Sequence, residues 1–318
     1  MQFLDFEQPI ADLLGKIIEL KRLSSNHSID INTEVDRLER KANQLTQSIF
    51  HKLNCWQIVQ LARHPLRPHS SDYIKELFTD FDEIHGDRVY GDDSALIAGM
   101  GSLDGLSVLI LAQEKGRDTN EKIKRNFGMM HPEGYRKAKR LALLAEKFKL
   151  PIITLIDTPG AYPGIGAESR GQSEAIAQNL KLFSSLKVPV ISVIIGEGCS
   201  GGALGIGVND SLLMMQYSYF ATISPEGCAT ILFKSAAKAA EAAQFMGITA
   251  EILLQHGIID EIVAEPLGGA HRDYAQAAQL LKSALLKQLD YLRSFPINEM
   301  VERRYQKILS KGSHGTLS

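Results

Sequence analysis

The sequence predicts a mixed α/β protein in which pairs of strands alternate with helices, preceded by a helical hairpin. Short apolar runs rich in β-branched residues, bounded by glycine or proline, indicate the strands. Longer stretches with apolar residues every three or four positions indicate helices, and only such stretches occur near the N-terminus. Two strands and then a helix, repeated without a fixed period, fit neither a regular βαβ order nor a β-sandwich.

The first segment, residues 1–63, is expected to form a helical arm that packs on its own domain or on a second subunit. The polar run Ser24–Ser28 should break the first helix, and Thr33 and Asp36 should form a capping box for the second. The apolar stripe of the first helix comprises Ile10, Leu13, Leu14, Ile17, Ile18 and Leu20. The seam of the second comprises Val35, Leu38, Ala42, Leu45, Ile49 and Leu53.

The second segment, residues 64–318, is expected to contain the sheet and C-terminal helices. Asp104-Gly105 between two apolar runs is a strong signal for a β-hairpin. The expected elements are a helix at 71–81, strands at 95–103 and 106–113, a helix at 132–149, a strand at 152–157, a helix at 172–186, strands at 188–195, 211–216 and 220–224, two to four helical segments, a strand at 258–263 and a helix at 274–293.

The composition is that of an ordinary soluble globular protein. The 318 residues are 44% hydrophobic and 23% charged, which suits one large domain with an accessory element. A formal net charge of −2 gives no reason to expect nucleic acid or a membrane as a partner. Three cysteines without a C-x-x-C pair fit a reducing compartment and match no common zinc pattern. Because no signal peptide or spanning stretch is evident, we expect a cytoplasmic protein.

The most informative segment runs from Val188 to Gly207, where an apolar run leads into six glycines. Such a pattern is typical of a buried strand that leads into a tightly packed helix. The first amides of a helix have no partner within it, and the helix dipole favours negative charge there. This corner is therefore expected to present backbone N–H groups to an anion.

A dinucleotide-binding site is one interpretation of the corner, because a G-x-G-x-x-G run begins at Gly196. That motif also needs an acidic residue at the end of the next strand, where it holds a ribose hydroxyl. The next strand, expected at 211–216, ends without one, and Asp210 stands at its other end. The fingerprint therefore lacks its confirming context.

Two further interpretations assign catalysis to the corner. A G-x-S-x-G match makes Ser200 a candidate hydrolase nucleophile, with Asp260 and His271 following in the order that such enzymes use. Alternatively no side chain reacts, and the amides of Gly201 and Gly202 form an oxyanion hole that glycine lets the substrate approach. Helix packing alone would need only one small residue, so six glycines favour close approach by a ligand.

Two other segments are candidates for ligand binding. Asp157–Gly164 follows a buried strand, where open α/β sheets bind ligands, and Gly160 and Gly164 offer further amides. No G-x-x-x-x-G-K-[ST] motif accompanies it, which excludes a P-loop enzyme. Between Lys115 and Arg140, nine basic residues against three acidic ones give +6, leaving −8 for the rest. This segment favours a phosphate-bearing ligand or an acidic partner.

Together these segments resemble the alpha subunit of bacterial acetyl-CoA carboxylase carboxyltransferase. They follow that family's order over nearly the whole chain, and they depart from its pattern at Cys199, where glycine is usual, and in the variable turn at 24–28. The stretches that carry the resemblance are FLDFEQPI (3–10), WQIVQLARHPLRP (56–68), GRDTNEKIKRNFGMMHPEGYRKAKRL (116–141), LPIITLIDTPGAYPGIGAESRGQSEAIAQNL (150–180), GEGCSGGALGIG (196–207), ISPEGCATILFKSA (223–236) and EPLGGAHRD (265–273).

The resemblance implies a crotonase-like fold, a spiral of ββα units, for residues 64–318. It implies transfer of a carboxyl group from carboxybiotin on a separate biotin carboxyl carrier protein to acetyl-CoA, giving malonyl-CoA for fatty acid biosynthesis. The implied partners are a beta subunit, in an α2β2 heterotetramer, and the biotin carboxylase of the ATP-dependent complex. No biotin is attached to this chain, and no metal is expected in it, because the zinc ribbon belongs to the beta subunit.

The implied chemistry has two oxyanions, the enolate of acetyl-CoA and the ureido oxygen of biotin. We expect Gly201 and Gly202 to serve the ureido oxygen and the beta subunit to serve acetyl-CoA. Because the biotin anion can act as the base, no catalytic side chain is required. The expected substrate-binding residues are Gly160, Gly164, Gly198, Lys122, Arg125 and Arg136. A non-enzymatic alternative is a scaffold or regulatory chain that binds nucleic acid through the basic segment.

Overall fold

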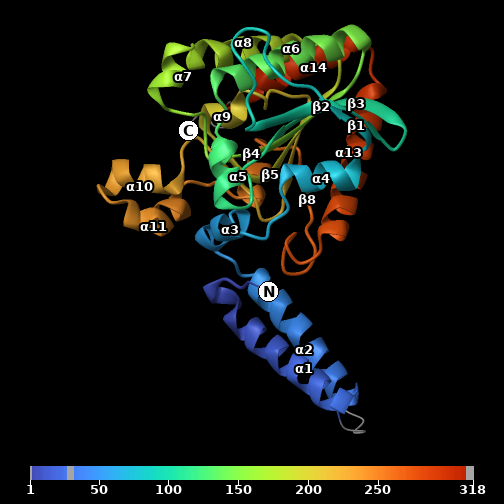
Figure 1. Ribbon diagram of the computed structural model, residues 1–318, viewed down its shortest axis with the longest axis vertical. Helices are drawn as coiled ribbons and strands as arrows, with labels where there is room; N and C mark the ends of the chain where they lie inside the picture. The colour runs from blue at the N-terminus through green and yellow to red at the C-terminus, as the bar shows by residue number, and fades with distance from the viewer. Residues whose placement is uncertain (1, 27–31, 313–318) are drawn as a thin grey trace, which may run out of the picture.

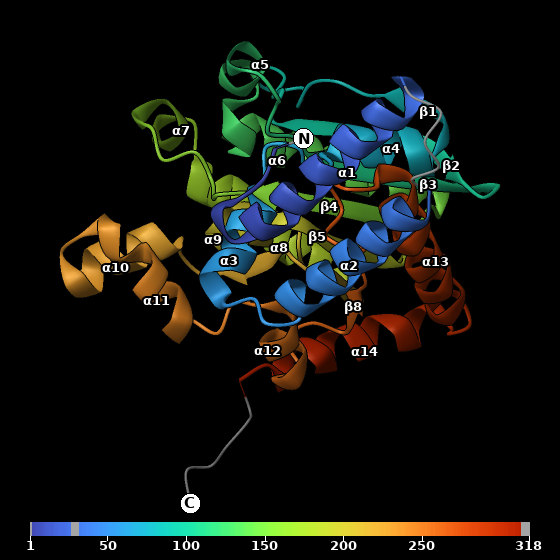
Figure 2. The same cartoon turned by 90° about the horizontal axis from the view of Figure 1, so that it is seen from below.

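The computed structural model describes residues 2–26 and 32–312, with the side chains of residues 23–26 left out of the description. The chain begins with a hairpin of two long helices that projects from a larger body (Figure 1). A short 3₁₀ turn, η1 (Asp5–Glu7), leads into α1 (Gln8–Asn26), and α2 (Asn32–Phe50) returns beside it (Figure 2). The predicted helical arm is therefore present.

The two helices pack through the apolar faces expected from their spacing. Ile17 of α1 and Val35 and Ala42 of α2 are buried against each other and against flanking leucines. The predicted capping box is wrong, because α2 already begins at Asn32 and Thr33 lies inside its first turn. The predicted break is also displaced: α1 continues to Asn26, and the rest of the turn, residues 27–31, lies outside the described residues.

The body contains one mixed sheet with helices on both faces. Its strands are β1 (Thr79–Glu83), β2 (Leu96–Leu103), β3 (Leu106–Gln113), β4 (Ile152–Thr158), β5 (Val190–Cys199), β6 (Ser211–Met215), β7 (Tyr219–Ala221) and β8 (Glu261–Val263). The order is β1-β2-β3-β4-β5-β6-β8, and β7 pairs with the last residues of β5. The first two pairings are antiparallel and the others are parallel.

The helices of the body have the following bounds. They are α3 (Cys55–Ala62), α4 (Ser70–Leu77), α5 (Thr119–Lys124), α6 (Pro132–Phe148), α7 (Ile165–Ser169), α8 (Gln172–Ser185), α9 (Ser200–Leu204), α10 (Pro225–Phe233), α11 (Ala239–Phe245), α12 (Ala250–Gln255), α13 (Tyr274–Arg293) and α14 (Ile297–Ser310), with 3₁₀ turns η2 (Asn126–Gly128) and η3 (Ala236–Lys238). In Figure 1, α6, α8 and α14 lie above the sheet, and α4 and α13 lie on its other side.

The core consists of two apolar layers separated by the sheet. Along β4, Ile152 and Ile156 join the layer under α6 and α8, whereas Ile153 and Leu155 join the layer under α4 and α13. Side chains alternate along a strand, so a strand covered on both faces is apolar throughout. The central strands β4 and β5 are buried along their whole length, which places their carboxyl ends in a rigid frame.

Some predicted elements have other bounds in the structure. The helix expected at 71–81 ends at Leu77, and the chain then forms the edge strand β1, which Gly99 admits because a side chain there would collide with the Asp82 carbonyl. The strand expected at 188–195 continues to Cys199, because β4 and β7 pair with its glycine-rich end. The C-terminal helices include α14, packed against α8, for which no bounds were predicted.

The arm is joined to the body through α3. Val59 of α3 is buried in one cluster with Cys199 of β5 and Tyr219 of β7. The domain boundary predicted after residue 63 stays a prediction. None of the helices in the described part of the chain is both long and apolar enough to cross a bilayer.

Candidate functional site

The glycine corner lies where β5 passes into the short helix α9. Ser200, the first residue of α9, has a φ of 55°, a left-handed conformation that turns the chain sharply out of the strand. Gly201 and Gly202 follow in the first turn, where helix geometry leaves amides without an intrahelical acceptor. Within residues 2–26 and 32–312, neither amide has a hydrogen-bond acceptor. The corner therefore offers two backbone donors.

Gly202 lies directly against the loop that follows β4. A Cβ at this position would overlap the Gly160 carbonyl carbon and lie 2.6 Å from the Ala161 amide nitrogen. Gly160 itself has a φ of 149°, a conformation that favours glycine, and its amide is bonded to Thr158 Oγ1 at 3.1 Å. The structure thus brings two of the predicted site residues, Gly160 and Gly202, into backbone contact. Glycine is required at 202 by this close approach.

An apolar cavity of about 630 Å³ opens beside the corner. Ser200 and Gly201 form its edge at α9, and the opposite wall comes from β7, α10, the end of α11 and the residues around α12. The wall residues are mostly aliphatic, sulfur-containing or aromatic, among them Leu204, Phe220, Ile223, Cys228, Met246 and Ile248. A pocket with few polar groups next to free backbone donors suits a ligand with an apolar body and one anionic oxygen.

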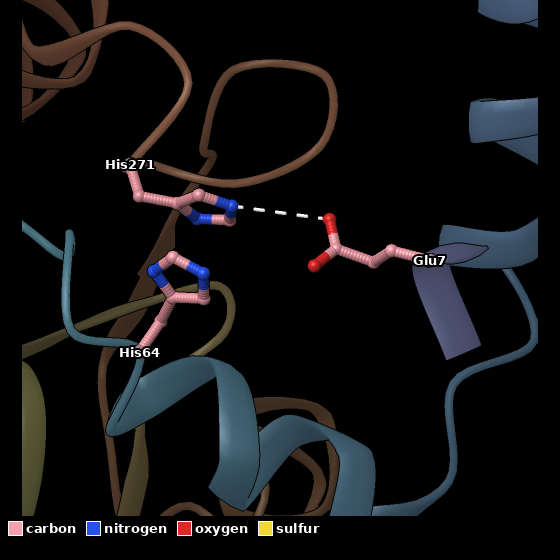
Figure 3. A group of neighbouring side chains, drawn as sticks. All are labelled: Glu7, His64 and His271. Carbon is pink, nitrogen blue, oxygen red and sulfur yellow. Dashed lines mark ion pairs between the residues drawn. The ribbon is translucent and has the colours of Figure 1, made fainter. Parts of the chain in front are cut away.

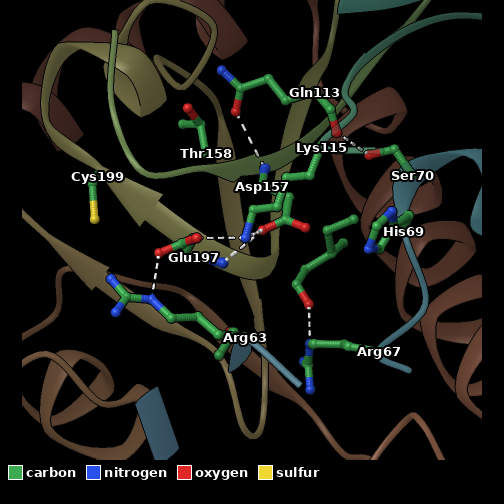
Figure 4. Close-up of polar contacts among 12 residues, drawn as sticks. Arg63, Arg67, His69, Ser70, Gln113, Lys115, Asp157, Thr158, Glu197 and Cys199 are labelled. Atoms are coloured by element: carbon green, nitrogen blue, oxygen red, sulfur yellow. Dashed lines mark hydrogen bonds and ion pairs between the residues drawn. The ribbon is translucent and has the colours of Figure 1, made fainter. Parts of the chain in front are cut away.

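A network of mostly buried charged groups lies next to the end of β5, where the corner begins (Figure 4). Lys115 Nζ lies 2.5 Å from Glu197 Oε1 and 2.8 Å from Asp157 Oδ1. The other Glu197 oxygen accepts hydrogen bonds from Arg63 Nε at 2.9 Å and from the Tyr219 hydroxyl at 2.5 Å. These groups come from the ends of β3, β4 and β5, from α3 and from β7, so the network ties together every element around the corner.

The network keeps Glu197 ionised. Burial by itself would raise the pKa of this carboxyl, but the charges of Lys115 and Arg63 outweigh it and lower the pKa to about 2. The neighbouring Cys199 thiol stays protonated at neutral pH, because burial raises its pKa to about 12. Cys199 is therefore a buried thiol and a poor nucleophile at neutral pH.

Stability in acid should depend on Glu197. A carboxyl whose pKa is 4.5 when unfolded and about 2 when folded stabilises the protein above pH 4.5 and loses that contribution as the pH falls toward 2. Denaturant unfolding at pH values between 4.5 and 2 gives the free energy of unfolding of each protein. As the pH falls, this free energy should decrease less for Glu197→Gln than for the wild type. The two slopes should differ by up to about 1.4 kcal/mol per pH unit. Parallel curves for the two proteins would contradict this coupling.

The other predicted ligand residues have mixed surroundings. Gly198 is buried in β5, where a side chain would press on Ile194 and Phe220, so its glycine serves packing. Gly164 is the N-cap residue of α7, and a side chain there would overlap the Tyr162 ring. These two residues stay predictions as substrate contacts.

The three basic ligand candidates also differ. Arg125 donates to the Ser94 carbonyl at 3.0 Å, and Arg136 pairs with buried Asp87 at 2.7 Å. Lys122, on α5, is partly exposed, and its side chain has no hydrogen bond or ion pair among the described residues. Of the three basic candidates, its side chain is therefore the one most able to bind a phosphate group of a ligand.

Most basic side chains of the segment are bonded to other groups of the fold. Buried Lys137 binds the Asp92 carboxylate at 2.7 Å and two backbone carbonyls, and Arg140 donates to the Gly86 carbonyl at 2.8 Å. Because these bonds orient most of the basic groups toward the fold, the segment offers few free cations for a nucleic acid backbone. The scaffold and nucleic-acid alternative is therefore not supported.

The hydrolase triad is not assembled. The Asp260 carboxylate accepts from the Leu212 amide at 2.6 Å and from Lys307 of α14 at 2.5 Å, while the His271 ring stacks on His64 at 4.0 Å. Ser200 lies instead on the edge of the apolar cavity. The prediction of Ser200 as a hydrolase nucleophile is not supported.

Asp210, which was considered for a ribose contact, is also bonded to another part of the fold. Both of its oxygens bind the buried Arg304 guanidinium, at 2.8 and 2.6 Å. The dinucleotide interpretation therefore gains nothing from the structure.

One group of side chains has a composition that metals use. Glu7, His64 and His271 are buried, and their ligand atoms lie within 4.8 Å of one another (Figure 3). However, His64 Nδ1 accepts a hydrogen bond from the Leu66 amide at 3.1 Å. The proton of the neutral ring therefore lies on Nε2. Nε2 is the nitrogen that faces Glu7 (Figure 3). The Glu7 carboxylate is bound by Arg272 at 2.5 Å. The group fastens the N-terminal segment to the body, and its protonation disfavours a metal.

Sequence reasoning missed most of the buried network and Gln113. The Gln113 side chain donates to the Gly202 carbonyl at 2.8 Å and accepts from the Asp157 amide at 3.2 Å. One signal was present in the sequence: Glu197 is a charged residue inside an otherwise apolar strand, and a buried carboxylate requires a buried cation. The identity of that cation, Lys115, depends on the pairing of β3, β4 and β5.

Comparison with known proteins identifies the fold and the family. A family model described as acetyl co-enzyme A carboxylase carboxyltransferase-like matches residues 3–312. The acetyl-coenzyme A carboxylase carboxyl transferase subunit alpha of Hydrogenovibrio crunogenus is 58% identical over 313 residues, covering 98% of this chain and 98% of that protein. The same subunit of Tolumonas auensis is 58% identical over 314 residues, covering 98% and 99%.

Among solved structures, transcarboxylase 12S with methylmalonyl-coenzyme A and methylmalonic acid bound aligns with a TM-score of 0.54 at 22% identity. The alignment covers 67% of this chain and 41% of that one. The fold is that of the crotonase-like carboxyltransferases, which confirms the predicted fold class. The chain belongs to the acetyl-CoA carboxylase carboxyltransferase alpha-subunit family, as the resemblance indicated.

Proposed function

We propose that this chain is the alpha half of a carboxyltransferase that transfers a carboxyl group from biotin on a carrier protein to acetyl-CoA, forming malonyl-CoA. The names of relatives at 58% identity support the reaction class. The observation that carries the proposal for the site is the pair of unbonded amides at Gly201, which lines the apolar cavity, and at the adjoining buried Gly202.

The corner suits the biotin ring system. Its cavity offers aliphatic walls to an apolar bicycle, and its edge offers N–H donors to one oxygen. When bound, carboxybiotin supplies the carboxyl group that acetyl-CoA accepts. The Gly201 and Gly202 amides hold the ureido oxygen and stabilise negative charge on it. Because the fold already holds these donors in place, they need not reorient during the reaction. Losing one such donor typically lowers the rate about 10²–10³-fold.

The remaining assignments follow from this placement. Gly160 shapes the corner by its contact with Gly202, and Lys122 meets the phosphates of CoA. Arg125 and Arg136 hold the surrounding loops in place through their internal bonds. A beta subunit completes the site with the oxyanion hole for acetyl-CoA, in an α2β2 heterotetramer that works with biotin carboxylase and a biotin carrier in the cytoplasm, at the start of fatty acid biosynthesis.

The chain on its own should not transfer carboxyl groups. Half of the proposed site comes from the beta subunit, so we expect malonyl-CoA synthesis from acetyl-CoA and carboxybiotin only after the two subunits are mixed. Radiolabelled carboxyl transfer measured with each subunit alone and with both tests this. Full activity from the purified chain alone would refute a shared site.

Ser200→Ala separates the oxyanion hole from covalent catalysis. The hydroxyl of Ser200 forms no bond in the proposed reaction, so we expect kcat to stay within about threefold of the wild type, against the 10⁴-fold or greater loss typical of a nucleophile. The assay is carboxyl transfer by the reconstituted complex. An inactive, correctly assembled Ser200→Ala complex would revive the hydrolase-like mechanism.

A further inference from the structure

Two buried side-chain amides bind backbone carbonyl groups of α9, one in the middle of the helix and one at its C-cap. Gln113 Nε2 donates to the Gly202 carbonyl at 2.8 Å, and Asn179 Nδ2 donates to the Gly205 carbonyl at 2.8 Å. Both side chains belong to residues with no exposed surface. A buried polar group left unpaired costs about 1–3 kcal/mol, so these bonds constrain the helix strongly.

The Gln113 side chain has only one satisfactory orientation. Its Oε1 accepts from the Asp157 amide at 3.2 Å (Figure 4), and its Nε2 also lies 3.3 Å from Met130 Sδ. Rotating the amide by 180° would set its oxygen against the Gly202 carbonyl and its NH₂ against the Asp157 amide. Both contacts would be repulsive. Gln113 therefore links the ends of β3, β4 and α9 in a fixed geometry.

This link acts on the part of α9 that carries the donor amides. The helix has five residues, two of them glycine, so it has little rigidity of its own. Gly202 is held between the Gln113 amide on its carbonyl and the Gly160 backbone against its Cα. The Gly202 carbonyl and the Gly202 N–H belong to adjacent peptide planes that meet at the Gly202 Cα. Holding this carbonyl and this Cα therefore restricts the direction of the N–H through the two backbone dihedral angles of Gly202. Asn179 instead holds Gly205, which lies beyond the donor amides.

We infer that Gln113 is a positioning residue, whose side-chain amide holds the Gly202 carbonyl and thereby fixes the backbone dihedral angles that point the Gly202 N–H toward the ureido oxygen. The inference rests on the proposed function of the corner. Gln113 touches neither substrate nor reacting atoms and acts only through Gly202.

The kinetic test uses the complex reconstituted from the full chain and its beta subunit. Gln113→Met keeps a similar volume but removes both bonds, and should lower kcat about ten- to hundredfold with KM for acetyl-CoA within threefold. The matched control, Asn179→Leu, loses an equally buried carbonyl bond and should keep kcat within threefold. Equal losses of kcat in the two variants would show a merely structural role and overturn the inference.

Gln113→Glu supplies a test by pH. A protonated carboxyl can donate to the Gly202 carbonyl and accept from the Asp157 amide, whereas a carboxylate repels the carbonyl. The rate of Gln113→Glu relative to the wild type should therefore rise as the pH falls, and that of Gln113→Met should not. A constant ratio for Gln113→Glu across the pH range would contradict the assignment.

Hydrogen exchange gives a readout that does not depend on carboxyl transfer. In the full chain, amides of residues 199–204 should exchange faster in Gln113→Met than in either the wild type or Asn179→Leu. Unchanged exchange in Gln113→Met would overturn the inference. If the wild-type complex transfers no carboxyl group, the proposed function fails, while the exchange result still decides whether Gln113 positions the corner.

Discussion

Gly202→Ala should lower kcat for carboxyl transfer at least a hundredfold. Its new methyl group would overlap the Gly160 carbonyl carbon and press on the Ala161 amide, forcing the corner away from the loop after β4. A shift of this kind moves an oxyanion donor, and one lost donor typically costs about 10²–10³ in rate. The measurement is steady-state carboxyl transfer by the complex, with assembly checked by size-exclusion chromatography.

Gly99→Ala is the matched control for this effect. It introduces the same methyl group into a similarly crowded site, where it would overlap the Asp82 carbonyl at the edge of the sheet. Both variants should lose stability, but only Gly202→Ala should lose most of its kcat at a temperature where both are folded. Equal activities in the two folded variants would show that the corner does not carry catalysis.

Lys115→Met should reduce the free energy of unfolding by about 3–5 kcal/mol, because removing one partner leaves buried charge uncompensated. Lys115 is the cation between Asp157 and Glu197, whose side chains are 5% and 7% exposed. Urea or guanidinium unfolding of the chain measures the loss. Lys21→Met, which breaks an exposed pair with Glu39 on the arm, should change stability by about 0.5 kcal/mol or less.

The double variant Lys115→Met, Glu197→Gln identifies the cause. Neutralising Glu197 removes the buried charge that lost its partner, so the double variant should be more stable than Lys115→Met alone. If the double variant is less stable by the sum of the two single losses, the network contributes through packing, and the electrostatic account is wrong.

Features governed by local rules could be predicted well from the sequence. The hairpin at Asp104-Gly105 is present because both residues adopt a positive φ, 54° and 83°, as that turn requires. The last predicted helix has the expected bounds, Tyr274–Arg293. In both cases the information lies within a few adjacent residues.

Elements that depend on distant partners had no predicted bounds. The strand β1 has an exposed, polar pattern and exists because the edge of β2 accepts it. The helix α14 is held by Arg304, whose guanidinium reaches Asp210 and the carbonyls of Phe183, Leu186 and Val188. No local pattern indicates such pairings, because the partners lie about a hundred positions apart in the chain.

The candidate site also combines a feature with a local sequence signal and features that depend on distant partners. The donor corner at Gly201 and Gly202 was found because glycines after a buried strand form a local signal. Its supports, Gln113 and Lys115, come from β3 and the residues after it, and they reach the corner only when β4 and β5 are paired alongside. The donors could thus be found from the sequence, whereas the groups that orient them required the fold.

The most direct measurement is a structure of this chain with its beta subunit and bound biotin. We expect the ureido oxygen to lie about 2.9 Å from the amide nitrogens of Gly201 and Gly202, with the bicyclic ring in the apolar cavity. If the ureido oxygen is bound elsewhere and both nitrogens donate to other protein groups, the proposed role of the corner is wrong.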